Sequence, residues 1–307
     1  MLSYIAKRLA IAVPTLLLLI IISFLLMHAA PGGPFTQERA LPPQVLANLE
    51  AKYGLDQPLW RQMANYVWGI VAHFDFGPSF IYKDRTVNEI IAQGFPVTLT
   101  YGSLSFALAV LVGVSLGVAA AIRHNTWLDY LAVGVSIGAQ VLPNFVMAPI
   151  LVLVFTLWLR WLPGGGWEGG EWQYIIMPVV ALSTSFMASI ARITRSSMLE
   201  VLNSNHIRTA RAKGLPERKV ILRHALKPAM LPVISYLGPA FVTMITGSVV
   251  VDIYFSTGGI GKAFVDSALN RDYAVMMGVT ILVGALTILF NLVVDILYAW
   301  IDPKIRY

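Results

Sequence analysis

Long apolar runs constrain this chain more than any other feature of its sequence. A helix of about 20 apolar residues crosses a bilayer, and six stretches approach or exceed that length: 9–29, 97–122, 131–159, 174–191, 230–251 and 274–301. Only 12% of the 307 residues are charged, against about 25% in a soluble domain. We therefore expect one all-α polytopic membrane domain over residues 1–307, with six transmembrane helices, and not the two soluble domains that the length would suggest.

The first run is expected to stay in the protein as a helix. Lys7 and Arg8 precede it, as in a secretory signal peptide, but its apolar part exceeds the roughly 7–15 residues of a signal-peptide core. The sequence that follows, His28-Ala29-Ala30-Pro31, is a poor cleavage site. With six spans, both termini lie on the same side of the membrane.

The charge distribution predicts which side that is. Lysine and arginine gather on the side of the termini, above all between Arg192 and Lys227, whereas acidic residues gather on the other side. The positive-inside rule makes both termini and this basic segment cytoplasmic. Because orientation accounts for most of the net charge of +6, the charge does not indicate a nucleic-acid partner, and membrane lipid is the expected surrounding.

The longest stretch between spans, residues 31–96, is expected outside. Pro42-Pro43 is expected to open a helix that runs to Tyr53, with Gly54 in the terminating position. A second helix begins near Pro58, with apolar residues at helical spacing and several aromatic residues. It either lies at the lipid headgroups or caps the outer ends of the spans. A functional alternative is a surface that meets a soluble partner or covers the pore mouth.

Two segments, Gly113–Gly117 and Gly134–Gly138, match the Gly-x-Ser-x-Gly pattern of serine hydrolases. Both lie inside apolar runs, and the five histidines lie in loops or at span ends, so no intramembrane base is apparent. We interpret both segments as Gly-x-x-x-Gly motifs for close helix packing. An intramembrane hydrolase is therefore a minor hypothesis. With no cysteine in the chain, thiol chemistry and thiolate metal sites are excluded.

The sequence contains no nucleotide-binding motif. Gly258–Lys262 resembles part of a phosphate loop, but a Walker A loop needs a glycine five positions before its second glycine and a serine or threonine after the lysine. Ser256 and Ala263 stand at those positions. We expect no cofactor on this chain, so if ATP drives it, ATP and Mg²⁺ bind to another chain.

Three polar residues within the runs are candidates to line a pore. Asn291 and Asp295 are four residues apart on one helical face, and a carboxylate inside a membrane must face protein or water. They could contact substrate or relay protons, or they could form a structural pair with a neighbouring helix. Asn144 follows Pro143, where we expect a kink that either lines a cavity or serves packing alone.

The basic segment 203–228 contains start and stop signals that predict two short helices. Asn203, Ser204 and Asn205 can cap the first, Gly214 can end it, and Pro216 can open the second. This compact form favours docking onto a partner protein over a solvated loop on headgroups. Ala210, Ala212 and Leu215 are small or apolar and are the candidates to enter a groove on that partner. The predicted docking residues are Arg208, Thr209, Ala210, Arg211, Ala212, Gly214, Leu215, Pro216 and Arg218.

At Arg208–Pro216 the chain resembles the cytoplasmic coupling loop of ABC-importer permeases, in the form found in the dipeptide and oligopeptide branch. The general motif begins Glu-Ala-Ala, with a glycine four positions after the last alanine. Ala210 and Gly214 fit that motif, but Arg208 and Thr209 replace its first two residues, so a role for the acid is not transferred. The resemblance covers nearly the whole chain, at residues 14–15, 30–32, 76–79, 162–167, 270–273 and 302–307.

The resemblance implies a type I ABC-importer fold and a pore-forming subunit that carries oligopeptides across the bacterial inner membrane. It further implies three kinds of partner: a second homologous permease, two cytoplasmic ATPases and an extracytoplasmic peptide-binding protein. ATP hydrolysis would take place on the ATPases alone. Dipeptides, nickel or glutathione are alternative cargoes. A secondary transporter or channel is the alternative from another class, disfavoured by scarce intramembrane charge and the lack of an internal repeat.

Overall fold

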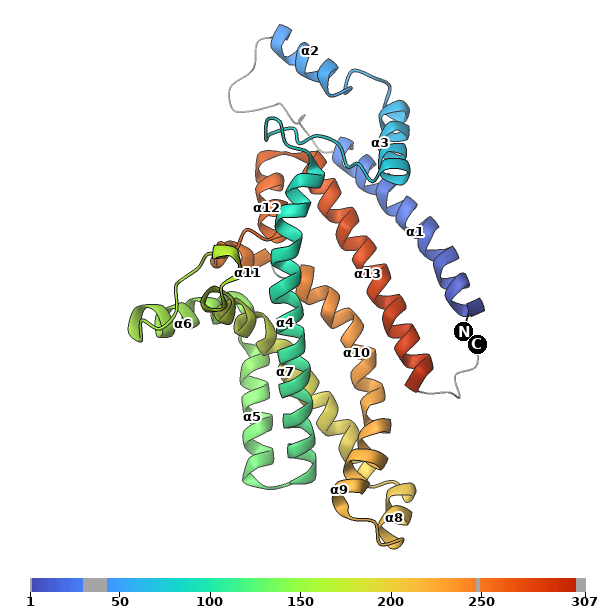
Figure 1. Ribbon diagram of the computed structural model, residues 1–307, viewed down its shortest axis with the longest axis vertical. Coiled ribbons are helices and arrows are strands. Elements are labelled where there is room, and N and C mark those ends of the chain that lie inside the picture. The colour runs from blue at the N-terminus through green and yellow to red at the C-terminus, as the bar shows by residue number, and fades with distance from the viewer. Residues whose placement is uncertain (1, 30–42, 247–248, 302–307) are drawn as a thin grey trace. The chain divides into compact units, whose positions relative to one another are not determined.

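The computed structural model describes residues 2–29, 43–246 and 249–301, and in these ranges the chain is built from helices (Figure 1). An isolated bridge between Pro78 and Thr86 is the nearest approach to a strand in the described part. The all-α prediction is confirmed. The elements are α1 (Leu2–Ala29), α2 (Pro43–Lys52), α3 (Leu59–His73), α4 (Val87–Ile122), α5 (Trp127–Val141), α6 (Asn144–Leu151), η1 (Val152–Trp158), η2 (Glu168–Gly170), α7 (Trp172–Leu202), α8 (Asn205–Ala212), α9 (Glu217–Lys219), η3 (Val220–Ala225), α10 (Leu226–Thr246), α11 (Val249–Tyr254), α12 (Ile260–Asn270) and α13 (Tyr273–Ile301).

Five helical segments are long and apolar enough to cross a membrane, and a bent pair makes a sixth. The bent pair joins Trp127–Val141 to Phe145–Trp158 at an angle of 107°. Proline lacks an N–H and disfavours helical backbone in the residue before it. Leu142, before Pro143, is accordingly extended, with φ −79° and ψ 110°. The predicted kink is confirmed, but the run 131–159 is not one helix: α5, α6 and the π-helix η1 share it.

Other helices extend well past the apolar runs. α4 begins at Val87, ahead of the predicted span 97–122, and contains Pro96. α7 reaches Leu202, past the predicted end at residue 191. Hydropathy marks the part of a helix that lipid can surround, whereas the backbone hydrogen bonds continue to the next true stop. The helices predicted in the outer segment are present as α2 and α3.

The chain divides into two compact units. Unit 1 comprises residues 99–257 and the end of α13 from Leu289, and unit 2 comprises residues 2–98 and 258–288. In unit 1, α7 is the central helix and packs against α5, α6 and α10. Its buried side chains include Met177, Leu182 and Met198.

Within unit 1, the glycine motif Gly113–Gly117 of α4 lies in close contact with α7. A Cβ on Gly117 of α4 would lie 2.5 Å from the carbonyl oxygen of Ala191 and 2.6 Å from Cβ of Thr194, both on α7. Gly113 is similarly close to α7, so the packing interpretation is confirmed there. Around Gly134 and Gly138 of α5, by contrast, no described atom lies within 4 Å of the added Cβ.

A buried ion pair also fastens α5 to α7. The Asp129 side chain is 1% exposed and accepts hydrogen bonds from Arg195 Nε at 2.5 Å and Arg195 Nη2 at 2.8 Å. The Asn125 backbone N–H donates to the same carboxylate at 3.0 Å, and His124 Nδ1 lies 3.1 Å from it. This two-point contact fixes how the two helices align.

Unit 2 is held by a small apolar core and a buried carboxylate. Ile20 of α1, Ile70 of α3 and Ile281 of α13 are buried together. Asp272, fully buried, accepts hydrogen bonds from the Ser79 hydroxyl and from the Phe80 backbone N–H. The sequence segments 76–79 and 270–273 are therefore in direct contact.

α3 combines two of the roles expected for the outer helix. Its Ile70 packs into the core of unit 2, so the helix covers other elements. Trp60 and Trp68 on its other face are 68% and 66% exposed, which suits a lipid-headgroup or protein surface.

We predict that Gly117→Ala destabilises the protein by about 1–3 kcal/mol, because the added methyl group overpacks the contact with α7. Gly138→Ala is the matched control, since its methyl group meets no described atom within 4 Å and alanine favours a helix more than glycine does. Thermal unfolding of both purified variants in one detergent measures the difference. Equal midpoints would contradict the close approach of α4 and α7.

We predict that Asp129→Asn costs about 3 kcal/mol, the lower end for a broken buried pair, because Arg195 keeps partial access to water. Adding Arg195→Gln should recover part of that loss, since no unpaired charge is then left between the helices. A double-mutant cycle of unfolding free energies measures the coupling. Simple addition of the two single losses would show that the residues do not act as a pair.

Candidate functional site

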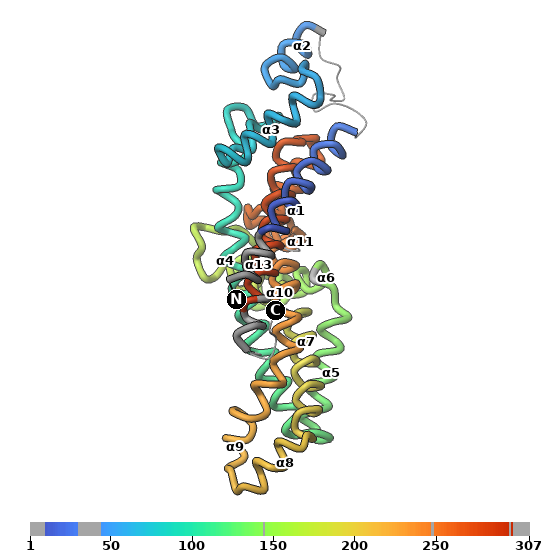
Figure 2. The backbone as a smooth tube through the Cα atoms, turned by 90° about the vertical axis from the view of Figure 1, so that its right-hand side faces the viewer, coloured from blue at the N-terminus to red at the C-terminus, as the bar shows by residue number. Residues whose placement is uncertain are grey.

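The candidate site is the polar turn that joins α7 to α10. Three short elements, α8, α9 and η3, lie at the end of unit 1 where α7 stops and α10 starts (Figure 2). Ser204 is the N-cap of α8 by its backbone, with φ −75° and ψ 156°, although its hydroxyl donates to the carbonyl oxygen of Val201 at 2.5 Å.

The breaks predicted in this turn are confirmed. Gly214 has φ +75°, a left-handed conformation that glycine adopts without steric cost, and α8 ends just before it. Pro216 then stands at the N-cap of α9. Because neither break needs a partner protein, the two-helix form belongs to the chain itself.

The loop has an inner face that packs on unit 1. Ile207 and Val220 are fully buried, together with Met198 of α7 and Ala229 of α10. Ala210 is only 6% exposed and belongs to the same cluster, and Leu215 packs against it. The expectation that Ala210 enters a partner's groove is therefore wrong for this structure: its methyl group supports the loop from inside.

The outer face of the loop is mostly cationic, and Leu222, which is 52% exposed, is the one large apolar side chain on it among the described residues. Within it, Arg211 and Glu217 form an exposed ion pair, with Nε–Oε1 at 2.8 Å and Nη2–Oε2 at 3.3 Å. Glu217 is the one acid of the segment 203–228. The exposed predicted residues are Arg208, Thr209, Arg211, Ala212, Gly214, Pro216 and Arg218.

This geometry suits docking rather than catalysis. A helix of eight residues, α8, presents small and basic side chains outward while apolar residues anchor it to the ends of two long helices. The buried cluster joins the loop to the end of α7 through Met198 and to the start of α10 through Ala229. The described residues include no group of three or more acidic or histidine side chains that could hold a metal ion.

The three polar pore candidates lie on two helices, α6 and α13. Asn291 is exposed on α13, and Asp295 follows one turn later on the same helix. Asn144 begins α6, immediately after the break at Pro143. The side chains of Asn144 and Asp295 lie outside the described residues, so their role as pore-lining or packing groups stays a prediction.

Sequence reasoning missed the ion pair between Asp129 and Arg195. The only indication in the sequence is an acid in the first turn of an apolar helix and an arginine beyond the end of another run. Neither indicates that the two residues pair across a separation of 66 positions.

Comparisons with known proteins agree with this arrangement. Residues 113–307 match the family described as binding-protein-dependent transport system inner membrane component, and residues 1–102 match its N-terminal family. The oligopeptide transport system permease protein OppB of Salmonella typhimurium is 60% identical over 307 residues, the whole length of both chains. The dipeptide transport system permease protein DppB of Bacillus subtilis is 40% identical over 306 residues, covering 100% of this chain and 98% of that protein.

A solved structure supports the fold. The permease architecture seen in inward-facing conformations of the MetNI methionine ABC transporter matches with a TM-score of 0.60 at 16% identity, over 70% of this chain and 97% of that chain. The ABC-importer permease fold implied by the loop motif is thereby confirmed. By sequence over its full length and by fold, this chain belongs to the family of binding-protein-dependent transport system inner membrane components.

Proposed function

We propose that this chain is the pore-forming subunit of an ATP-driven importer that carries oligopeptides across the bacterial inner membrane. The observation that carries this proposal is the 60% identity, over the full length of both proteins, to an oligopeptide permease. The dipeptide permease at 40% identity makes dipeptides the second candidate cargo. The chain itself is a permease and not an enzyme, so ATP and Mg²⁺ act on partner subunits.

The outer face of the coupling loop, residues 203–228, is the proposed contact with one of two cytoplasmic ATPases. Its exposed Arg208, Ala212 and Gly214 lie on short, anchored elements. Closure of the ATPases would push on this face, and the buried Ile207 and Val220 would pass the movement to α7 and α10. A second, homologous permease would complete the pore, and an extracytoplasmic protein would deliver peptide.

The pore itself is proposed to involve the broken span. α5 and α6 meet at 107°, and irregular backbone inside a membrane is tolerated where it faces protein or water. Asn144 stands at that break, which supports a role in lining the path. Asn291 and Asp295 are proposed to line it or to pair with a neighbouring helix.

The proposed orientation can be read by labelling, because the native chain has no cysteine. We predict that Lys83→Cys in the outer segment reacts with a membrane-impermeant maleimide on intact spheroplasts. Lys213→Cys in the coupling loop should react only after permeabilisation, since both residues are exposed but lie on opposite sides. The reverse pattern would overturn cytoplasmic termini.

We predict that Ala212→Trp uncouples transport without unfolding the permease. Ala212 is exposed on the outer face, so an indole there blocks a close contact with the ATPase but disturbs no core. In proteoliposomes holding the complete transporter and its binding protein, ATP-dependent uptake of a labelled oligopeptide should fall at least tenfold, and less ATPase should co-purify.

Two controls make that result specific. Arg123→Trp places the same bulk on an exposed turn outside the loop and should leave uptake unchanged. Ala210→Trp should instead reduce the yield of folded permease, because Ala210 is buried. Normal uptake by Ala212→Trp would contradict docking through this face, and a wild-type transporter without ATP-dependent peptide uptake would contradict the proposed function.

A further inference from the structure

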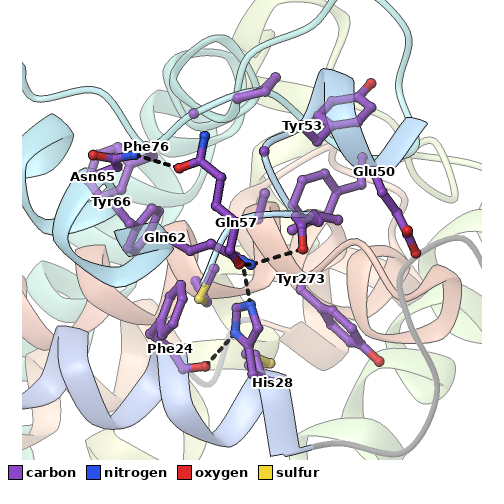
Figure 3. Close-up of a pocket in the computed structure, with 18 residues that line it drawn as sticks. Phe24, His28, Glu50, Tyr53, Gln57, Gln62, Asn65, Tyr66, Phe76 and Tyr273 are labelled. Carbon is purple, nitrogen blue, oxygen red and sulfur yellow. Dashed lines mark hydrogen bonds between the residues drawn. The ribbon is translucent and has the colours of Figure 1, made fainter. Parts of the chain in front are cut away.

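Unit 2 contains a partly open cavity that the importer mechanism above does not use. Its volume is about 410 Å³, within the range of about 300–1,000 Å³ that is typical of small-molecule sites. Figure 3 shows it between the end of α1, the α2–α3 turn and the first turn of α13. In the proposed orientation this is the outer end of unit 2.

Hydrogen bonds within the protein hold the walls in place. The Gln62 side-chain amide donates to the carbonyl oxygens of Leu55 at 3.0 Å and Gln57 at 2.7 Å. Its oxygen faces Nε2 of His28, on α1, at 3.2 Å. The opposite wall is fixed by the buried contact of Ser79 and Phe80 with Asp272. The cavity is therefore formed before any ligand arrives.

The lining is aromatic and carries little charge. Six rings and two thioethers line it, from Phe24, Tyr53, Tyr66, Phe76, Phe80, Tyr273, Met27 and Met277. Among the described lining residues Glu50 is the one carboxylate, and no lysine or arginine is present. Such a site favours a ligand with an apolar group and a positive charge, because aromatic faces attract cations and the carboxylate of Glu50 attracts them too.

One polar group in the wall lacks a partner. The Tyr66 hydroxyl is buried and makes no hydrogen bond to any residue that the structure describes. Its burial raises the pKa of Tyr66, so the group keeps its proton and can donate. A buried donor left unpaired is costly, but its oxygen is closed off from the cavity, so no ligand contact is assigned to it.

We propose that this cavity binds the N-terminal residue of a peptide, with its apolar side chain among the rings and its ammonium group at Glu50. This inference rests on the proposed function, since it makes the permease a peptide-binding protein on its outer side. The site discriminates by the charged amino end: a free N-terminus is bound and a C-terminal carboxylate is not required.

The test uses the purified transporter complex in lipid nanodiscs without its binding protein, so that peptide sites on that protein cannot contribute. The probes are Phe-Ala-Ala, its N-acetyl form and its C-terminal amide, titrated by calorimetry. We expect saturable binding of Phe-Ala-Ala, a loss of about tenfold or more in affinity on acetylation, because a charge-assisted contact is removed, and no loss on amidation.

Matched variants locate the site. Glu50→Gln should lower the affinity for Phe-Ala-Ala by about the same factor as acetylation of the peptide does. Asp56 is an exposed acid outside the cavity, so Asp56→Asn should leave that affinity unchanged. Asn65→Trp at the wall should abolish binding, whereas Ala64→Trp, its exposed neighbour outside the lining, should not. Both tryptophan substitutions are at exposed positions, so the fold tolerates them.

Three results would overturn the inference: no saturable binding to the wild-type complex, equal binding of the acetylated peptide, or equal effects of Glu50→Gln and Asp56→Asn. Uptake assays separate this from the importer proposal. If the complete transporter with its binding protein takes up peptide but the permease complex alone binds none, the outer site is wrong and the importer function stands. If no ATP-dependent uptake occurs, the importer function itself fails.

Discussion

The close contact of α7 with its neighbours is the constraint on which unit 1 depends. Gly117 lets α4 approach α7 until no side chain fits between them, and the Asp129–Arg195 pair fixes α5 to α7 at two points. In lipid, apolar burial alone gives little preference for one helix alignment over another, so close packing and paired polar groups determine it. A helix fixed on two sides can carry displacement along its length, which is what a coupling loop at its end requires.

The same loop shows how far sequence reasoning reached. The breaks at Gly214 and Pro216 were predictable because they are local: one needs positive φ and the other lacks an N–H. Which face of α8 is buried was not predictable in the same way. Ala210 and Ala212 are both alanines and only two positions apart, yet Ala210 is buried and Ala212 is exposed. The position of α7 determines which of the two is buried.

Long-range contacts account for the rest of what the sequence did not reveal. The apolar runs predicted the number and order of the spans, and Pro143 predicted the break in the third. The Asp129–Arg195 pair and the outer cavity instead join residues far apart in the chain. Periodicity and capping describe neighbours along one helix, so they carry no information on such partners.

The two glycine motifs sharpen this distinction. Gly113–Gly117 and Gly134–Gly138 have the same spacing and the same central serine position, but among the described residues only the glycines of the first have atoms of another helix within 4 Å of an added Cβ. A small-residue motif therefore states what a helix surface permits, namely a close approach of backbones. Whether such an approach occurs depends on which helix packs against the motif. For α4 that helix is α7, whose alignment with α5 is fixed by the Asp129–Arg195 ion pair.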